Sequence, residues 1–280
     1  MLSLIGLKAD DFRHPLDLEA TQALKQLPGL DLAVRSLLGS VAEEFFHINN
    51  IASSILVGEN QLPDLHKLLL EACKTLDLSV PQLYVQQNPT PNAYTFAMRG
   101  KKPFMVLHTS LIELLTPEEI QAVIAHELGH LKCEHGVYIT LANIIVLAAG
   151  LLPNWGVPVA QSLQTQMFEW LRCAEFSCDR AALLGTQNPR AVMSVLMKLA
   201  GGSPTLAPQL NLDAFVEQAR TYEAIGQTQL GEMLQATQTE QLSHPVPVLR
   251  TKEIDRWSSS QDYQQLLNKH VSSQRGWRNW

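Results

Sequence analysis

The sequence lacks the features that mark several common classes of protein. It has no long cluster of basic residues and its net charge is −6, so nucleic acid is not an expected partner. None of its 4 cysteines forms a C-x-x-C pair, which argues against a thiolate zinc site and favours reduced thiols. The short apolar start has neither a basic region nor a cleavage site, so a cytoplasmic protein is expected.

Long hydrophobic runs are also scarce. The most apolar stretch, residues 137–152, is shorter than the roughly 20 residues that a membrane-spanning helix needs. It is therefore either a buried core helix or a segment that makes peripheral contact with a membrane. Charged residues make up only 17% of the chain, which favours extensive helix–helix burial, a membrane-facing patch or an oligomer surface. The oligomeric state does not follow from the sequence.

The clearest signal in the chain predicts a buried helix that begins near residue 116. Thr116 suits the N-cap, Pro117 suits the first helical position, and Glu119 completes a capping box. Apolar residues then recur at helical spacing around most of the circumference. This helix carries the only motif of the chain that by itself predicts chemistry.

That motif is H-E-x-x-H, formed by His126, Glu127 and His130. The two histidines are one helical turn apart, so both imidazoles project from one face and can hold one metal ion. Glu127 stands beside the first histidine, where it can take a proton from a metal-bound water. Two histidines alone do not make a catalytic site, because zinc also needs a third protein ligand and an open position.

A second helix, predicted at residues 157–184, carries two carboxylates on one face. Glu175 and Asp179 are one turn apart among largely apolar or small neighbours. Such carboxylates are costly to bury unless something pairs with them. A bound metal is one such partner, and an ordinary ion pair with Arg172 or Arg180 is the other.

The remaining periodicity predicts an α+β protein that is mainly α-helical. Helices are expected at 17–27, 32–46, 62–76, 190–200, 211–224 and 228–240. Short strands are expected at 82–87, 93–98 and 103–109, with a hairpin turn at 100–102. Residues 243–250 read as a rigid segment, and the Gln/Ser-rich tail from 258 is expected to be loosely held.

The strand that starts at residue 93 precedes the motif helix directly. An extended peptide can add itself to such an edge as one more strand. The alternative is a hairpin with a purely structural role, and both interpretations fit the sequence.

Four motifs occur in a fixed order over roughly residues 60–256. They are Asn92-Ala93-Tyr94, the run from Glu119 to His130 with His135 after it, Glu175 to Arg180 followed by Asn188-Pro189-Arg190-Ala191, and His244-Pro245 with Arg250. In this combination the sequence resembles the M48 family of zinc metallopeptidases, which includes HtpX, Ste24 and Oma1. The resemblance implies a gluzincin, with a zincin-like catalytic domain that has a small β-sheet before the H-E-x-x-H helix.

The resemblance also implies roles for particular residues. One Zn²⁺ ion per chain would be held by His126, His130 and Glu175, with Glu127 as the general base. Asp179 would hold a ligand histidine in its tautomer. The remaining implied residues belong to the cleft: His244 and Arg250 would steady the tetrahedral intermediate or order the site, and Asn92, Ala93 and Tyr94 would align the substrate backbone.

We therefore expect an N-terminal helical segment (1–57), a metallopeptidase domain (58–256) and a C-terminal tail (257–280). The expected function is zinc-dependent hydrolysis of peptide bonds in polypeptides, with a role in protein quality control. Two alternatives stay open: a non-catalytic zinc-stabilised protein that binds peptides or docks on membranes, and a latent protease with a covered cleft. Relatives of the HtpX and Ste24 type have several transmembrane helices, and their usual hairpin reads Asn-Ala-Phe-Ala where this chain has Asn-Ala-Tyr-Thr. Topology and substrate class are therefore not carried over from them.

Overall fold

The computed structural model describes residues 2–26, 48, 52–96, 102–136, 138–139, 157–226, 228 and 244–276, with the backbone alone at 157–164 and 271–276. The predicted helices at 32–46 and 228–240 and most of the apolar run at 137–152 lie outside these residues. Whether that run is a core helix or a membrane contact therefore stays a prediction. Within the described part of the chain, no helix combines the length and hydropathy that a bilayer crossing requires.

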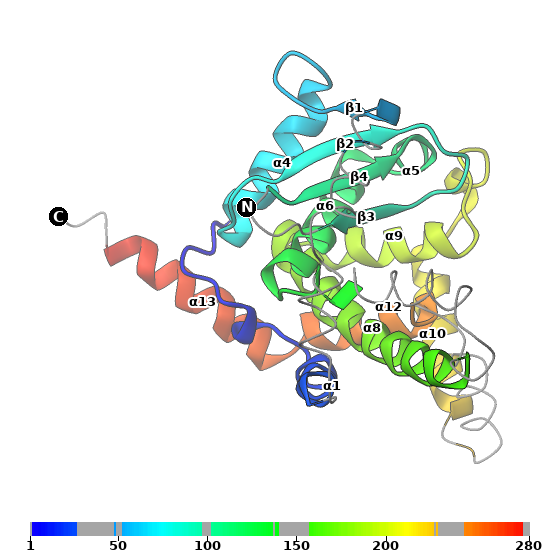
Figure 1. The fold of residues 1–280 in the computed structure, drawn as a ribbon. Coiled ribbons are helices and arrows are strands. Elements are labelled where there is room, and N and C mark those ends of the chain that lie inside the picture. Colours follow the sequence, from blue (N-terminus) through cyan, green and yellow to red (C-terminus); the bar gives the residue numbers. More distant parts are fainter. Residues whose placement is uncertain are drawn as a thin grey trace.

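A mixed sheet of four strands lies on one side of the molecule (Figure 1), in the order β1 (Ile55–Leu56), β2 (Gln82–Gln86), β4 (Phe104–His108) and β3 (Ala93–Phe96). β2 and β4 are parallel, whereas β3 and β4 are antiparallel; apart from residue 102, the predicted turn at 100–102 lies outside the described residues. This arrangement confirms the three predicted strands and puts β3 at one edge of the sheet. β1 was not predicted, because it is only 2 residues long and both side chains are exposed.

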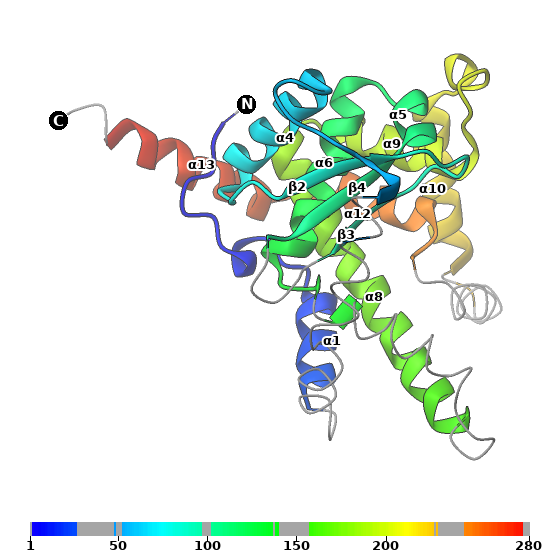
Figure 2. The same cartoon turned by 45° about the horizontal axis from the view of Figure 1, so that its top comes forward.

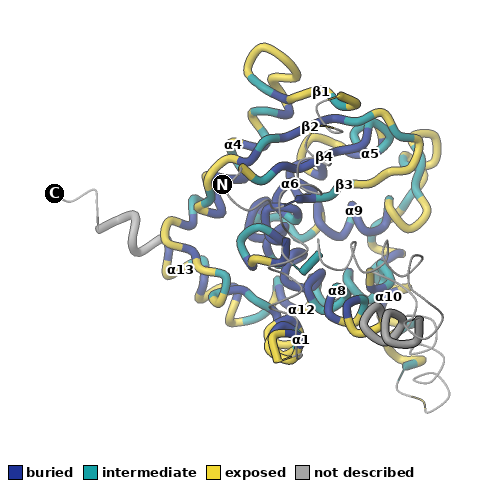
Figure 3. The backbone as a smooth tube through the Cα atoms, viewed as in Figure 1, coloured by how far each residue is buried: buried dark blue, intermediate teal, exposed yellow. Residues whose placement is uncertain are grey.

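The described helices surround and extend this sheet. They are α1 (Pro15–Lys25), α4 (Pro63–Leu76), α5 (Thr109–Leu114), α6 (Pro117–Lys132), α8 (Val157–Thr186), α9 (Pro189–Gly201), α10 (Leu212–Gly226), α12 (Pro247–Ser258) and α13 (Gln261–Gly276), with short 3-10 turns at Ala9–Asp11 and Ala207–Gln209. In Figures 1 and 2, α4, α6 and α9 lie next to the sheet, and α1, α8, α10 and α12 lie beyond them. The most continuously buried part of the chain is α6 with the second half of α8 (Figure 3).

α6 begins at the predicted capping box. Thr116 Oγ1 accepts a hydrogen bond from the Glu119 backbone N–H at 3.4 Å, and Glu119 Oε2 accepts one from the Thr116 N–H at 2.7 Å. The Glu119 carboxylate also accepts hydrogen bonds from Lys198 and Ser194 of α9, both at 2.6 Å. The cap therefore fixes the start of the motif helix and ties it to α9 at the same time.

α6 and α8 approach each other at two glycines. A Cβ on Gly129 would lie 2.8 Å from the Cβ of Ala181 and 3.0 Å from the Cα of Cys178, and a Cβ on Gly185 would overlap that of Ala125. Real side chains do not tolerate such distances, so the close crossing depends on the absence of a side chain at both positions. The crossing brings the histidine face of α6 against the carboxylate face of α8.

The C-terminal end of the described chain is held more firmly than the sequence suggested. The prediction of a loosely held tail is wrong for residues 258–276, because α13 buries Tyr263 and Leu266 in the core. The ring centroid of Tyr263 lies 5.0 Å from that of Trp257. This helix was not predicted because α13 contains many glutamines and serines, and its few apolar residues recur at helical spacing among them. Pro247 also begins α12 inside the segment that was expected to be merely rigid.

Candidate active site

The two histidines of α6 face one carboxylate of α8. His126 Nε2 lies 3.4 Å from Glu175 Oε2, and His130 Nε2 lies 3.4 Å from Glu175 Oε1. Two ligands that are each about 2.1 Å from one ion lie about 3.4 Å apart at the tetrahedral angle. Each of the two histidine–carboxylate distances therefore fits a pair of ligands on one tetrahedral ion such as zinc.

The bonding of Glu175 supports the same conclusion. The residue is buried, and its Oε2 lies 3.0 Å from His244 Nδ1 and 3.2 Å from Arg250 Nη1, in ion pairs whose angles do not meet those of a hydrogen bond. Arg250 keeps the carboxylate ionised, and an ionised carboxylate oxygen is a ligand atom for a divalent metal. His126, His130 and Glu175 together could thus hold a divalent ion.

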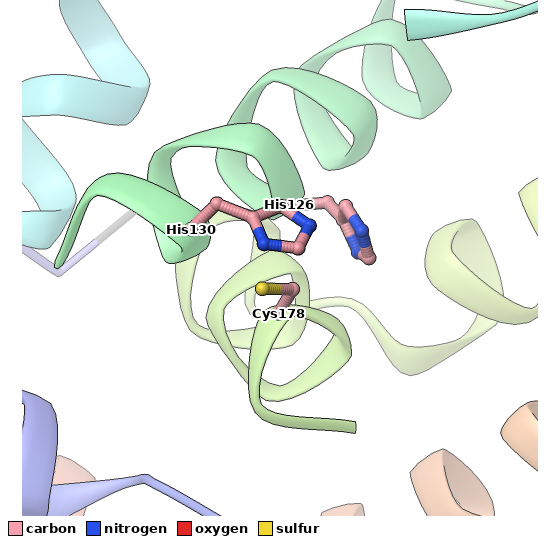
Figure 4. Close-up of side chains that lie close together, drawn as sticks. All are labelled: His126, His130 and Cys178. Atoms are coloured by element: carbon pink, nitrogen blue, oxygen red, sulfur yellow. The ribbon is translucent and has the colours of Figure 1, made fainter. Parts of the chain in front are cut away.

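Cys178 is a second candidate metal ligand beside the histidine pair (Figure 4), and a ligand atom of each of the three residues lies within 4.8 Å of the others. Its Sγ lies 3.7 Å from Nδ1 of His135, an atom that is itself 3.2 Å from Nδ1 of His130. The thiol is therefore on the Nδ1 side of His130, whereas Glu175 faces Nε2. Burial raises the pKa of the Cys178 thiol well above its usual value, and metals bind the thiolate. Glu175 is accordingly the better third ligand.

His126 and Glu175 form a charged pair in the metal-free protein. Burial lowers the pKa of His126, but the carboxylates of Glu175 and Asp179 outweigh this effect and raise it to about 10. Burial likewise raises the pKa of Glu175, and His244, Arg250 and His126 together hold it well below its usual value. A proton on His126 therefore competes with a metal ion for this site.

We expect metal binding to release this proton. Because the pKa of His126 is about 10 and a ligand imidazole must be neutral, apparent affinity should rise about tenfold per pH unit between pH 6 and 9. Titration calorimetry in buffers of different ionisation enthalpy measures the released proton directly. In Asp179→Asn one of the two carboxylates that raise the pKa of His126 is gone, so the release should shrink. Metal uptake that does not depend on pH or buffer would contradict the assignment.

Asp179 and Arg250 lie behind the first histidine. Asp179 Oδ1 is 3.1 Å from His126 Nδ1, so the carboxylate can accept the Nδ1–H and leave Nε2 for a metal. Arg250 of α12 donates to both oxygens of Asp179, from Nη2 at 2.6 Å and from Nε at 2.8 Å. The sequence suggested Arg172 or Arg180 as ion-pair partners, but the arginine that pairs with Asp179 is Arg250.

His244 lies at the rim of the site. Its side chain is 62% exposed, while that of Arg250 is only 12% exposed. The negative charge of Glu175 raises the pKa of His244, and burial opposes this to a smaller extent. Both residues line the cleft, but His244 is the more accessible to a ligand there, whereas Arg250 also holds Asp179.

Glu127 is held by a residue that was not predicted. Thr95 Oγ1, on β3, donates a 2.8 Å hydrogen bond to Glu127 Oε2, and both residues are buried. Thr95 lies two positions after Ala93, so both side chains are on the face of the sheet that contacts α6. The signal for this contact in the sequence is Asn-Ala-Tyr-Thr, in which Thr95 stands where the usual pattern has alanine.

Thr95→Val is expected to lower kcat about 10- to 150-fold, the effect of losing one hydrogen bond of about 1.5–3 kcal/mol to a charged group. Valine has the same shape but no hydroxyl, so metal content should stay unchanged. Steady-state cleavage of a quenched fluorescent peptide measures the loss. Thr95→Ser retains the hydroxyl and should remain close to wild type; equal losses in both variants would show that the methyl group matters instead.

An open cleft of about 380 Å³ runs along the site. Most predicted site residues line it, including Asn92 and Ala93 at the start of β3. His130 and Tyr94 do not: His130 lies 3.4 Å from Glu175, which does line the cleft, and the Tyr94 side chain is on the other face of the sheet, its ring centroid 6.1 Å from that of His108. Much of the remaining lining is aliphatic and comprises Leu111, Val123, Val192, Val195, Leu196, Leu199 and Val246.

Comparison with known proteins places these features in a family. Residues 59–258 match the sequence profile of Peptidase family M48. The chain is 56% identical over 263 residues to the Plastoglobule-localized metallopeptidase 48, chloroplastic, of Arabidopsis thaliana, a match that covers 94% of this chain and 76% of that protein. It is 28% identical over 170 residues to Protease HtpX homolog 2 of Methanosarcina acetivorans, covering 52% of this chain and 58% of that protein. The crystal structure of S. mikatae Ste24p gives a TM-score of 0.48 at 15% identity, over 86% of this chain and 61% of that one.

Proposed function

The chain belongs to peptidase family M48, and from this premise we propose that it is a zinc-dependent endopeptidase whose active site is the cleft between α6, α8 and β3. The observation that carries the proposal is the Glu175 carboxylate, with one oxygen 3.4 Å from Nε2 of His126 and the other 3.4 Å from Nε2 of His130. Glu127 lies beside this trio and lines the cleft. A purely structural metal site has no need of such a base.

Zinc bound there supplies a Lewis acid that polarises a carbonyl and makes water more acidic. Glu127 accepts the proton of the attacking water and passes it to the leaving amine. Thr95 keeps the Glu127 carboxylate turned toward the cleft. Arg250 and Asp179 hold His126 in the tautomer that a metal ligand needs, and His244 at the rim can donate a hydrogen bond to the negative oxygen of the tetrahedral intermediate.

We further propose that the enzyme binds its substrate as an extended strand with an apolar side chain next to the scissile bond. Among the described strands β3 is at the edge of the sheet, next to Glu127, where a peptide backbone would add as one more strand. The wall of the cleft formed by α9 offers only aliphatic side chains, among them Val192, Leu196 and Leu199. Such a wall stabilises an apolar residue and leaves a charged one without a partner.

The test is cleavage of a mixed peptide library, read by mass spectrometry, before and after chelation. We expect cuts beside apolar residues, loss of cutting with a chelator, and recovery with stoichiometric Zn²⁺. Zinc binding without any cutting would favour the non-catalytic peptide-binding alternative. Cutting that appears only after truncation of the terminal segments would favour a latent protease.

The place of action is proposed from two observations. The Arabidopsis thaliana relative is named for its location at plastoglobules, and residues 137–152 of this chain form an apolar run too short to span a bilayer. We propose that the enzyme works at a lipid surface without crossing it. Flotation with liposomes tests this, and protein that stays entirely at the bottom of the gradient would contradict it.

A further inference from the structure

A chain of buried polar groups runs from helix α1 to the metal site. His135, which follows α6, has its Nδ1 3.2 Å from Nδ1 of His130 and its Nε2 3.1 Å from Oδ2 of Asp17. Asp17 lies on α1 and is completely buried, as is His135. The three residues thus connect a predicted ligand to a helix that lies outside the family match at 59–258.

Asp17 is surrounded by donors. Its Oδ2 accepts a hydrogen bond from Ser177 Oγ at 2.6 Å, its Oδ1 accepts one from Thr21 Oγ1 at 3.0 Å, and Arg13 Nε lies 3.7 Å from Oδ2. Burial raises the pKa of Asp17, but the hydrogen bonds from His135 and Ser177 outweigh it and leave the pKa lowered. Asp17 is therefore ionised and can only accept hydrogen bonds.

The negative charge of Asp17 determines which ring nitrogen carries a hydrogen in His135 and in His130. Because Asp17 only accepts, Nε2 of His135 must carry a hydrogen. A neutral imidazole has one such hydrogen, so Nδ1 of His135 is an acceptor and takes the Nδ1–H of His130. His130 then presents the lone pair of Nε2, the atom that faces Glu175.

We propose that Asp17 is a positioning residue for the metal ligand His130, acting through His135 to fix its tautomer and ring orientation. This inference rests on the proposed metal site. In this arrangement a carboxylate orients each candidate ligand histidine. Asp179 acts directly on His126, and Asp17 acts on His130 through the imidazole of His135. Loss of such outer partners typically weakens metal binding 10–100-fold.

The competing explanation is that Asp17 only helps α1 to pack on α8. Leu24 supplies a matched control, because it is a buried residue of the same helix that packs with Met167 and Trp170 of α8 and takes no part in the polar chain. Leu24→Ala therefore loosens the packing and leaves the hydrogen bonds intact. Asp17→Leu removes the carboxylate, and His135→Phe removes the acceptor while retaining a ring against Trp170, whose centroid is 5.5 Å away.

The experiment measures two quantities in the full-length protein. The first is the tautomer of His130 in the metal-free protein, from ¹⁵N–¹H long-range correlation spectra of ¹⁵N-histidine-labelled samples. The second is the Zn²⁺ dissociation constant, from competition with a chromophoric chelator. In Asp17→Leu and His135→Phe, we expect His130 to lose its single Nδ1–H tautomer and the dissociation constant to rise about 10–100-fold. Leu24→Ala should keep both wild-type values at a lower melting temperature.

Three results would overturn the inference: an unchanged His130 tautomer in the two variants, an unchanged dissociation constant in them, or an equal rise in Leu24→Ala. If Asp17→Leu does not fold, His135→Phe alone decides. Should the wild-type protein bind no zinc, the proposed function fails, while the tautomer measurement still decides whether Asp17 controls His130.

Discussion

Glu127→Gln is expected to lower kcat by about 10²–10⁴-fold or more, the contribution that general acid–base catalysis usually makes. Glutamine has the same shape and its amide oxygen can still accept the hydrogen bond from Thr95, but it cannot take a proton at neutral pH. Glu127 is not one of the three candidate zinc ligands, so the amount of bound zinc should stay at the wild-type level. Peptide cleavage and metal analysis on the same sample measure both quantities.

Glu118→Gln is the matched control for this change. Glu118 lies next to Glu119 in the first turn of the same helix, is exposed, and accepts a hydrogen bond from Asn188 well away from the cleft. It should retain wild-type cleavage. Activity within about threefold of wild type in Glu127→Gln would remove Glu127 from the role of base, and parallel loss of zinc would show a structural role instead.

Glu175→Gln should weaken zinc binding by at least about 100-fold, because loss of a direct ligand costs more than loss of an outer partner. The amide keeps the volume but removes the charge that balances His126 and Arg250. The pKa of His126 should fall at the same time, since Glu175 is the main group that raises it. The dissociation constant for Zn²⁺ and the number of protons released on binding report the two effects.

Glu169→Gln provides the control on the same helix, at an exposed position of α8. It should bind zinc as wild type does. Full zinc affinity in Glu175→Gln would point to Cys178 as the third ligand, since its thiol is the other candidate donor beside the histidine pair. Cys178→Ser would then abolish binding, whereas the geometry at Nε2 predicts that it has little effect.

The sequence predicted those parts of the site that depend on local spacing. One helical turn separates His126 from His130, and another separates Glu175 from Asp179, so each pair could be assigned to a helix face without tertiary information. The strands beside the motif helix and the capping box at Thr116 follow from equally local patterns.

Contacts between distant segments could not be predicted. Arg250 is 71 positions from Asp179, and Asp17 is 118 positions from His135, and neither pairing leaves a pattern in a single sequence. Thr95 reaches Glu127 only because β3 lies against α6. α13 escaped prediction for another reason, since few of its residues are apolar and the buried stripe is narrow.

The close crossing of α6 and α8 at Gly129 and Gly185 has a thermodynamic consequence. The candidate ligands are divided between these two helices, so an ion bound to all three is a cross-link between segments that sit 45 or more positions apart in the chain. Zinc that binds only the folded arrangement adds about 2.7 kcal/mol to the free energy of unfolding when its free concentration is 100 times the dissociation constant. The resistance of this protein to unfolding should therefore track the zinc supply of its surroundings.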